Sequence, residues 1–281
     1  MGCREILGQG AVNHVFVVTT AEGTLVVRFH RDPLDTDDYA AEAWCLQTLK
    51  EAVPVPSCVA LGVCEGIRFI VQSFVEGELA DCHRSPDLWR SLGQYARIIN
   101  EFPLDASAPD SLFPRFGRDL LQNWHRHIDY NLAALTANDD LLMLGAYDIR
   151  HQDCLRRAFS NLRQRVTRFG LTHGDLVPKN VLLPPNRSPV VIDWGSASTG
   201  AAPYHDYLRV RPDDAEEGFT IDDLECFGQG YGTPVRELAS TMDDLSLLNK
   251  IDVVRWAIDC RPDRMEAYVA LARQAVLQRF D

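Results

Sequence analysis

The first third of the chain alternates apolar and polar residues in a way that predicts β-strands. β-Branched and aromatic residues fill positions 15–19 and 25–29, and the turn-forming segment 21–24 joins them into a hairpin. A second hairpin is predicted from 58–61 and 67–74, because a Glu-Gly turn lies between these two apolar runs. Two successive hairpins indicate a small antiparallel sheet.

One helix is predicted between the hairpins, and the pattern becomes helical after Gly77. Three of the four residues at 35–38 are acidic, which suits the positive end of a helix dipole. This helix is expected to end near Glu51, ahead of two prolines. Beyond Gly77, Ser85 and Pro86 supply an N-cap and a first-turn proline for a helix with regular apolar spacing.

The remainder of the chain is predicted to be mostly helical. Apolar residues over 155–169 keep helical spacing with arginines on the opposite face, and Gly170 is expected to end that helix. Further helices are predicted over 117–135, 236–248, 250–260 and 263–279. The fold class is therefore α+β, with a β-rich lobe of residues 1–77 and a larger helical lobe of residues 78–281. The connection between the lobes is expected near 72–78.

Composition excludes several classes of protein. The 281 residues are 46% hydrophobic and 24% charged, which is ordinary for a globular chain. No apolar run approaches the roughly 20 residues that span a bilayer. The formal net charge of −12 disfavours nucleic-acid binding and leaves cationic partners open. Eight scattered cysteines and an N-terminus without a signal-type apolar stretch favour a reduced, cytoplasmic protein with no membrane partner.

The strongest candidate chemistry surrounds two short apolar strands that are expected over 181–183 and 190–192. Asp175 and Asn180 precede the first strand and Asp193 follows the second, so all three side chains are expected on loops beside paired strands. Short oxygen-bearing side chains of this kind suit Mg²⁺ together with substrate phosphates. An Asp, an Asn five residues later and an Asp-x-Gly after a strand form the arrangement of kinase catalytic centres.

A phosphate-binding region is predicted from the N-terminal segment. Gly8 and Gly10, followed by Asn13, form a turn in which backbone N–H groups can approach phosphate oxygens. Only three of the 28 basic residues are lysines and none lies on the strand that follows, so the expected phosphate-binding cation is Arg28. Glu42, on the next helix, is placed to orient Arg28. The alternative is a surface arginine and a solvated glutamate.

Together these segments resemble the aminoglycoside phosphotransferase family, whose fold is similar to that of protein kinases. The residues that carry the resemblance are His173-Gly174-Asp175 with Asn180, and Ile192-Asp193-Trp194-Gly195. The resemblance covers nearly the whole chain and is diffuse over 100–170 and after 225. It implies a two-lobed, protein-kinase-like fold and an ATP-dependent kinase of small molecules.

The resemblance also implies a role for each residue near the reacting groups. Asp175 is expected to accept the proton of the substrate hydroxyl, and His173 to organise the catalytic loop. Asn180 and Asp193 are expected to bind one or two Mg²⁺ ions that bridge the nucleotide phosphates. Asp206 resembles a family aspartate that braces the catalytic loop.

The nucleotide site follows from the same resemblance, with two departures, one in the phosphate loop and one at the strand lysine, which is Arg28 here, as in a number of family members. Arg28 would hold the phosphates of ATP or GTP, and backbone groups near Ser73 and Val75 would read the base. Asn13 replaces the third glycine of the phosphate loop. Val177 stands two residues after the catalytic aspartate, as expected for this family, whereas protein kinases have a lysine there. No activation-loop segment ending in Ala-Pro-Glu is present, so protein substrates are disfavoured.

The acceptor is predicted to be a hydroxylated small molecule, and an aminoglycoside antibiotic is favoured, with resistance as the role. The acidic segment 213–225 could line a pocket for amino groups, and a solvated acidic loop is the equal alternative. Its candidate substrate residues are Asp213, Asp214, Glu216 and Glu217. Macrolides, choline, homoserine and sugars stay open as acceptors, and so does a nucleotide-binding regulatory protein with a degenerate site. The sequence leaves open the choice between ATP and GTP, the reacting hydroxyl and the oligomeric state.

Overall fold

The structure, a computed structural model, describes the chain except for residues 1, 6–12, 31–37, 114–116 and 213–217. The chain forms two compact units. The first unit comprises residues 1–114 and 170–232, and the second comprises 115–169 and 233–281. The lobe boundary expected near residue 77 stays a prediction.

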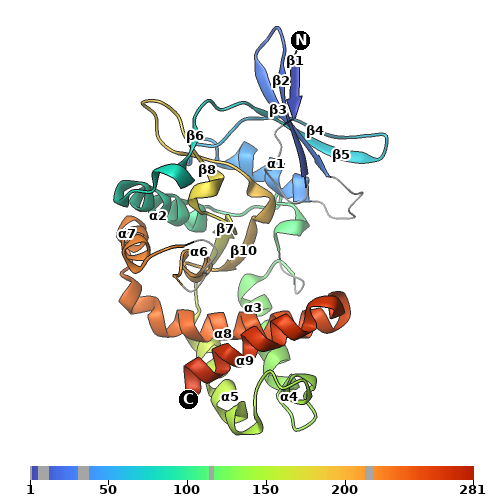
Figure 1. The fold of residues 1–281 in the computed structure, drawn as a ribbon, viewed down its shortest axis with the longest axis vertical. Helices are drawn as coiled ribbons and strands as arrows, with labels where there is room; N and C mark the ends of the chain where they lie inside the picture. Colours follow the sequence, from blue (N-terminus) through green and yellow to red (C-terminus); the bar gives the residue numbers. More distant parts are fainter. Residues whose placement is uncertain (1, 6–12, 31–37, 114–116, 213–217) are drawn as a thin grey trace. The chain divides into compact units, whose positions relative to one another are not determined.

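The first unit contains a five-stranded antiparallel sheet in the order β1-β2-β3-β5-β4 (Figure 1). The first predicted hairpin is confirmed as β2 (Asn13–Thr19) and β3 (Thr24–His30). The second is confirmed as β4 (Cys58–Cys64) and β5 (Ile67–Ser73). The edge strand β1 (Gly2–Glu5) was not anticipated, because its four residues are all exposed and show no apolar alternation.

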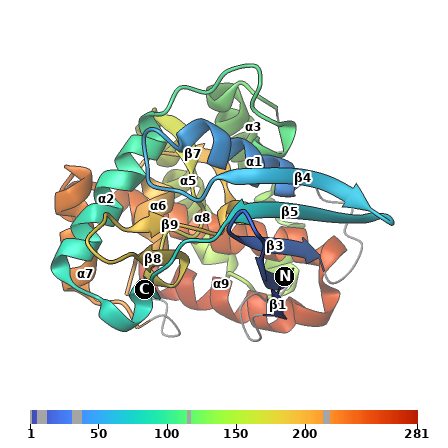
Figure 2. The ribbon, with the colours of Figure 1, turned by 90° about the horizontal axis from the view of Figure 1, so that it is seen from above.

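The predicted helix between the hairpins is α1 (Asp38–Leu49). It lies against β4 and β5, as both ribbon views show (Figure 1, Figure 2). The helix is buried on most of its circumference, including the apolar side chains of Tyr39, Leu46 and Leu49. Glu42 is carried into this core and has no exposed surface. A glutamate in that position needs a partner of opposite charge.

Short strands frame the segments that carry the candidate chemistry. A three-stranded sheet has the order β6-β8-β9, formed by β6 (Glu78–Leu79), β8 (Val181–Leu183) and β9 (Val190–Val191). The strands predicted over 181–183 and 190–192 are therefore confirmed as the antiparallel pair β8–β9. A second small sheet pairs β7 (Phe169–Thr172) with β10 (Ser198–Ala201).

The expectation that Gly170 ends a helix is wrong. The helix α5 (Gln152–Arg165) ends earlier, and Gly170 lies inside strand β7. A β-carbon at this position would collide with the backbone carbonyl of Asn100. The glycine is therefore explained by close backbone packing rather than by helix capping.

Three further helices of the first unit support the site. The predicted helix after Ser85 is α2 (Pro86–Glu101), and the Ser85 side chain caps it by accepting a hydrogen bond from Leu88 N. It packs closely against α7 (Ile221–Tyr231). The short α6 (Tyr204–Arg209) lies between β10 and α7 in the chain and contacts both.

The second unit is helical. Its main elements are α3 (Leu120–Ala134), α5, α8 (Val235–Cys260) and α9 (Met265–Phe280), with the short α4 (Asp140–Met143). The division of residues 236–260 into two helices is wrong, because α8 runs through Leu248 and Ile251 with no glycine or proline to interrupt it. Among the described residues, no helix has the length and apolar character that crossing a membrane requires.

Candidate active site

The loop after β7 has a backbone shape that depends on Gly174. This residue has φ +80°, and a β-carbon there would collide with the backbone carbonyl of Ser196. Only glycine combines that left-handed conformation with so close an approach. The segment that follows Asp193 is thereby packed directly against the loop that contains Asp175.

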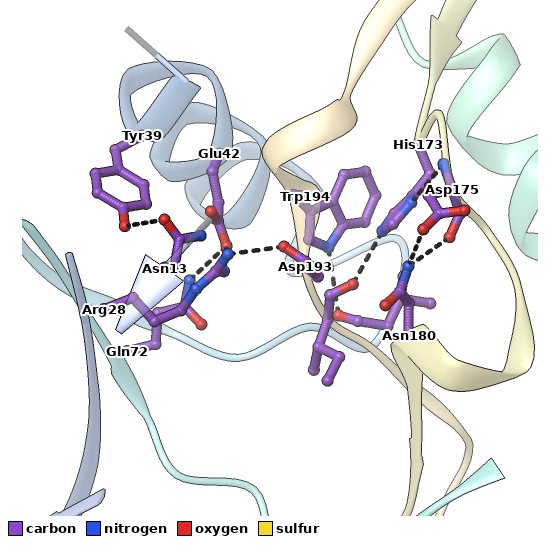
Figure 3. Close-up of polar contacts among 12 residues, drawn as sticks. Asn13, Arg28, Tyr39, Glu42, Gln72, His173, Asp175, Asn180, Asp193 and Trp194 are labelled. Atoms are coloured by element: carbon purple, nitrogen blue, oxygen red, sulfur yellow. Dashed lines mark hydrogen bonds and ion pairs between the residues drawn. The ribbon is translucent and has the colours of Figure 1, made fainter. Parts of the chain in front are cut away.

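His173 is fully buried and makes two hydrogen bonds that hold this loop. Its Nε2 contacts the Ile192 carbonyl at 3.1 Å, and its Nδ1 accepts from the Asp175 backbone N–H at 3.3 Å. The ring also contacts Trp194, with centroids 4.5 Å apart (Figure 3). Burial lowers the pKa of His173 to about 4, so the ring is neutral near pH 7. A neutral ring with both nitrogens engaged organises the loop and is unsuited to proton transfer.

Asp175 is half-buried and has a donor on each carboxylate oxygen. Asn180 Nδ2 donates to Oδ2 at 2.8 Å and also to the Asp175 carbonyl at 2.8 Å. Arg209 Nε donates to Oδ1 at 2.6 Å, and Lys179 Nζ lies 3.6 Å from Oδ2. Burial by itself would raise the pKa of Asp175, but the hydrogen bond and charge of Arg209, together with Lys179 and Asn180, more than offset this and lower it. The carboxylate is therefore ionised near neutral pH.

Arg209 was missed by the sequence reasoning. It is the last residue of α6 and lies 34 residues after Asp175. No pattern around it distinguishes it from the other arginines of the chain, since arginine supplies nearly all of the basic residues. Only the fold brings it to the catalytic loop.

Arg28 and Glu42 form a buried ion pair. Arg28 Nη1 lies 2.5 Å from Glu42 Oε1, and only 8% of the arginine is exposed. Gln72 Nε2 donates to the same glutamate oxygen at 2.7 Å, a contact that no sequence pattern indicated. Burial by itself would lower the pKa of Arg28, whereas the carboxylates of Glu42 and Asp193 raise it, so this side chain is a permanent cation. The surface-pair alternative is wrong for these two residues.

Asp193 connects the buried pair to the catalytic loop. Arg28 Nη2 donates to Asp193 Oδ1 at 2.7 Å, so Arg28 bridges Glu42 and Asp193 (Figure 3). Asp193 has φ +61° and ψ +64°, a left-handed backbone conformation that is rare for a residue other than glycine. Such strain costs on the order of 1–3 kcal/mol and persists where the surroundings over-determine it. In this conformation, the Asp193 carboxylate points toward Arg28.

The donor set of Asn180 and Asp193 fits a hard cation. The Asn180 amide nitrogen is turned toward Asp175, and its Oδ1 makes no hydrogen bond to the described part of the chain. Asp193 Oδ2 likewise has no partner among the described residues, and about half of the side chain is exposed. Carboxylate and amide oxygens are the ligands that Mg²⁺ takes in proteins, with phosphates and water completing the shell. The described residues contain no cluster of three His, Cys, Asp or Glu side chains that could hold a metal by themselves.

The other predicted nucleotide residues are only partly described. Gly8 and Gly10 lie outside the described residues. Asn13 Oδ1 accepts a hydrogen bond from the Tyr39 hydroxyl at 3.0 Å, which ties the start of β2 to α1. The Ser73 N–H donates to the Ser57 carbonyl at 2.9 Å, so that amide is already used. The roles of Asn13, Ser73 and Val75 toward a nucleotide stay predictions.

The predicted substrate residues Asp213, Asp214, Glu216 and Glu217 lie outside the described residues. The rest of the acidic segment is better defined. Asp222 and Asp223 occupy the first turn of α7, where Asp223 and Thr220 form a capping box. The loop interpretation is therefore wrong from Ile221 onward, because this part of the segment is a helix that Asp223 caps.

Asp206 is buried behind the catalytic loop. Its Oδ2 accepts from Asn100 Nδ2 at 2.8 Å, and the same amide donates to the Leu171 carbonyl at 2.9 Å, two residues before His173. The Tyr231 hydroxyl donates to Asn100 Oδ1 at 2.9 Å and completes the network. Burial raises the pKa of Asp206 to about 7, and the hydrogen bond from Asn100 offsets this only in part. Asp206 therefore supports strand β7, which precedes the catalytic loop, through Asn100.

Solved structures with the same fold cover nearly all of this chain. A GDP and kanamycin complex of APH(2")-IIia matches with a TM-score of 0.67 and 20% identity, over 99% of this chain and 94% of that chain. The macrolide 2'-phosphotransferase MphH from Brachybacterium faecium matches with a TM-score of 0.62 and 18% identity, over 98% and 91%. The aminoglycoside phosphotransferase APH(4)-Ia matches with a TM-score of 0.61 and 16% identity, over 100% and 94%. At these identities the likeness shows the fold, which is α+β and kinase-like. No curated protein matches the chain significantly.

The family is shown by the sequence as a whole. Residues 4–242 match the model of the phosphotransferase enzyme family, and this range contains every predicted site residue from Gly8 to Glu217. The resemblance inferred from the two short motifs is therefore confirmed. The chain belongs to the phosphotransferase enzyme family and is therefore an enzyme, and its fold is protein-kinase-like.

Proposed function

We propose that this protein transfers the γ-phosphoryl group of ATP or GTP, with Mg²⁺, to a hydroxyl group of a small molecule. The observation that carries the proposal is that Asp175, Asn180 and Asp193 lie in one compact unit with the buried Arg28–Glu42 pair. Phosphoryl transfer depends on positioning and on charge stabilisation, and this set supplies both.

Asp175 is the group that would accept the proton of the acceptor hydroxyl. Its carboxylate is held by Asn180 on one oxygen and by Arg209 on the other, so its direction is set before a substrate arrives. Because its pKa lies below the usual range, it is a weak base and would take the proton late in the reaction. A loose transition state, in which the nucleophile needs little activation, suits such a base.

Arg28 would hold the phosphate oxygens of the nucleotide. Its guanidinium is fixed by Glu42, and Gln72 fixes that glutamate in turn, so no reorganisation is needed when the charge develops. Asn180 Oδ1 and the Asp193 carboxylate would hold Mg²⁺, which when bound neutralises charge on the phosphates. Arg28 already contacts Asp193, so the cation-binding and phosphate-binding groups are neighbours.

An aminoglycoside is the acceptor we favour. The acidic residues Asp213, Asp214, Glu216 and Glu217 follow the metal-binding segment in sequence and would attract amino groups. APH(2")-IIia, which shares the fold, is found in complex with kanamycin. A macrolide is the second candidate, because MphH shares the fold to a similar degree. Choline, homoserine and sugars have no specific observation in their favour.

A cytoplasmic location and a role in antibiotic resistance accompany this proposal. All eight cysteines are free thiols, which suits a reducing compartment. The net charge of −12 suits a cationic small-molecule partner better than a nucleic acid.

The test is phosphate transfer from ATP and from GTP, with and without Mg²⁺, across aminoglycosides, macrolides, choline, homoserine and sugars. We expect Mg²⁺-dependent product with one class of acceptor. Asp175→Ala should abolish turnover and leave the nucleotide Kd within about threefold of wild type. Asp87→Ala, which removes an exposed aspartate of α2, is the matched control and should behave as wild type. Turnover by Asp175→Ala would overturn the assignment, and nucleotide binding without transfer to any acceptor would favour a regulatory protein.

A further inference from the structure

Arg209 binds the catalytic carboxylate from outside both sequence motifs. Its Nε donates to Asp175 Oδ1 at 2.6 Å, which is a short, charge-assisted hydrogen bond. The residue belongs to neither the His173–Asn180 segment nor the Ile192–Gly195 segment. Nothing in the motifs that define the site therefore assigns it a role.

Arg209 and Asn180 together determine how the Asp175 carboxylate is oriented. Asn180 holds Oδ2 at 2.8 Å, and Arg209 holds Oδ1. A single donor would leave the carboxylate free to turn about the Cβ–Cγ bond, whereas donors on both oxygens fix its plane. Lys179, at 3.6 Å from Oδ2, adds positive charge without a hydrogen bond of normal length.

The helix that carries Arg209 is anchored in the core. Tyr207 is fully buried and makes edge-on ring contacts with Phe227 at 5.1 Å and Tyr231 at 5.4 Å. Asp206, the residue before it, is buried and bound to Asn100. The guanidinium is thus presented from a rigid base, which is what a group that positions another side chain requires.

We propose that Arg209 is a positioning residue for phosphoryl transfer, which aligns the Asp175 carboxylate for the acceptor hydroxyl and balances its charge. This inference rests on the proposed function. Each carboxylate oxygen keeps a lone pair that Asn180 and Arg209 do not use, and the hydroxyl would bind there. The contribution falls on the transfer step, because the group that Arg209 holds is the Asp175 carboxylate.

The test compares Arg209→Ala and Arg209→Lys with wild type. Arg209→Ala is expected to lower kcat by about tenfold to hundredfold, the range that misalignment of a reacting group produces. The Kd for the nucleotide should stay unchanged, and Arg209→Lys should recover part of kcat. Guanidinium ion added to Arg209→Ala should restore part of the rate, since about a quarter of the Arg209 side chain is exposed and its site can be reached. Arg90→Ala removes an exposed arginine of α2 paired with Asp87 and should show neither the loss nor the rescue.

The outcomes separate this inference from the proposed function. Loss of turnover in Asp175→Ala with normal kcat in Arg209→Ala would overturn the role of Arg209 alone. Normal turnover in Asp175→Ala would overturn the proposed function itself. A fall in kcat without rescue by guanidinium or by lysine would also overturn positioning, because it indicates a general structural defect. If Arg209→Ala does not fold, Arg209→Gln replaces it, and the same comparisons decide.

Discussion

Each of the two compact units buries an arginine–carboxylate pair, and the two pairs differ in what lies beyond them. In the first unit, Arg28 contacts Glu42 at 2.5 Å and continues to Asp193, whose side chain is about half exposed. In the second unit, Arg255 Nη1 and Nη2 each donate to Asp139 at 2.8 Å, and neither side chain is more than 8% exposed. We call the Arg28–Glu42 pair open, because Arg28 also contacts the accessible Asp193 carboxylate. We call the Arg255–Asp139 pair closed, because both of its side chains are buried.

Among the described residues, the partners of the closed pair all lie inside the helical unit. Asn131 accepts from Arg255 Nε at 3.2 Å, and the Tyr147 hydroxyl donates to Asp139 at 2.7 Å. A buried ion pair is therefore not by itself the mark of an active site in this protein. What distinguishes the first pair is an accessible, strained aspartate at its end, beside the loop that carries Asp175.

The largest expected effect is on stability, at the closed pair. Arg255→Ala leaves the Asp139 charge buried without its partner, so we expect the free energy of unfolding to fall by about 3–5 kcal/mol. Urea denaturation checks this. The activity of each folded molecule should be unchanged, because the described contacts of Arg255 all lie within the second unit. A loss of activity in fully folded Arg255→Ala would break the comparison.

The second largest effect is on catalysis, at the open pair. Arg28→Ala removes a preorganised cation, so we expect kcat/KM for the nucleotide to fall by about 10²–10³. Steady-state kinetics with varied nucleotide measure this. Stability should fall as well, because Glu42 stays buried. A variant that lost stability and kept full kcat/KM would show that the two pairs have the same, purely structural role.

A smaller effect is expected from Tyr147→Phe. The change removes one hydrogen bond to the Asp139 carboxylate and leaves the ion pair in place. Hydrogen bonds to charged groups contribute about 1.5–3 kcal/mol, so unfolding should become easier by that amount. Thermal unfolding with and without the substitution measures it. An effect as large as that of Arg255→Ala would mean that the tyrosine, rather than the arginine, stabilises the carboxylate.

The last expected effect is on the pH dependence of stability, and it distinguishes two buried aspartates. Burial raises the pKa of Asp206 to about 7, whereas for Asp139 the effect of burial is more than offset by Arg255 together with the Tyr147 hydroxyl, and the pKa is lowered. The folded state therefore favours protonated Asp206, and its contribution to stability is lost as pH rises from about 4 to about 7. In Asp206→Asn this part of the decline should disappear, as measured by urea unfolding at pH 5 and pH 8. An unchanged slope would mean that Asp206 is ionised in the folded protein.

Much of the fold could be predicted from the sequence, because the patterns that indicate these strands and helices are local. Both hairpins, the helix α1 and the helix after Ser85 follow from alternation, turns and caps within about ten residues. The misreading of Gly170 has a different cause. In a sequence, a glycine that ends a helix cannot be told from a glycine that lets two backbone segments approach. Only the backbone of Asn100, which lies against Gly170, distinguishes the two cases.

The same division applies to the site. Asp175 and Asn180 are five residues apart and Asp193 follows the next strand, so a short motif was enough to indicate their chemistry. Arg28 and Glu42, fourteen residues apart, could be paired from strand and helix spacing. Gln72, Asn100 and Arg209 had no such signal, because their contacts to Glu42, Asp206 and Asp175 span 30, 106 and 34 residues.

Residue order and spacing were sufficient to indicate a phosphotransferase with a kinase-like fold, since motifs and periodicity are properties of the chain alone. Which arginine reaches Asp175, which carboxylate closes the Arg28 bridge and which ion pair stays sealed depended on the folded arrangement. Hydrogen bonds act over about 3 Å, and a linear sequence does not specify which distant residues come that close. The type of reaction at the first unit could thus be predicted from the sequence. The side chains that orient the catalytic and phosphate-binding groups were determined by tertiary packing.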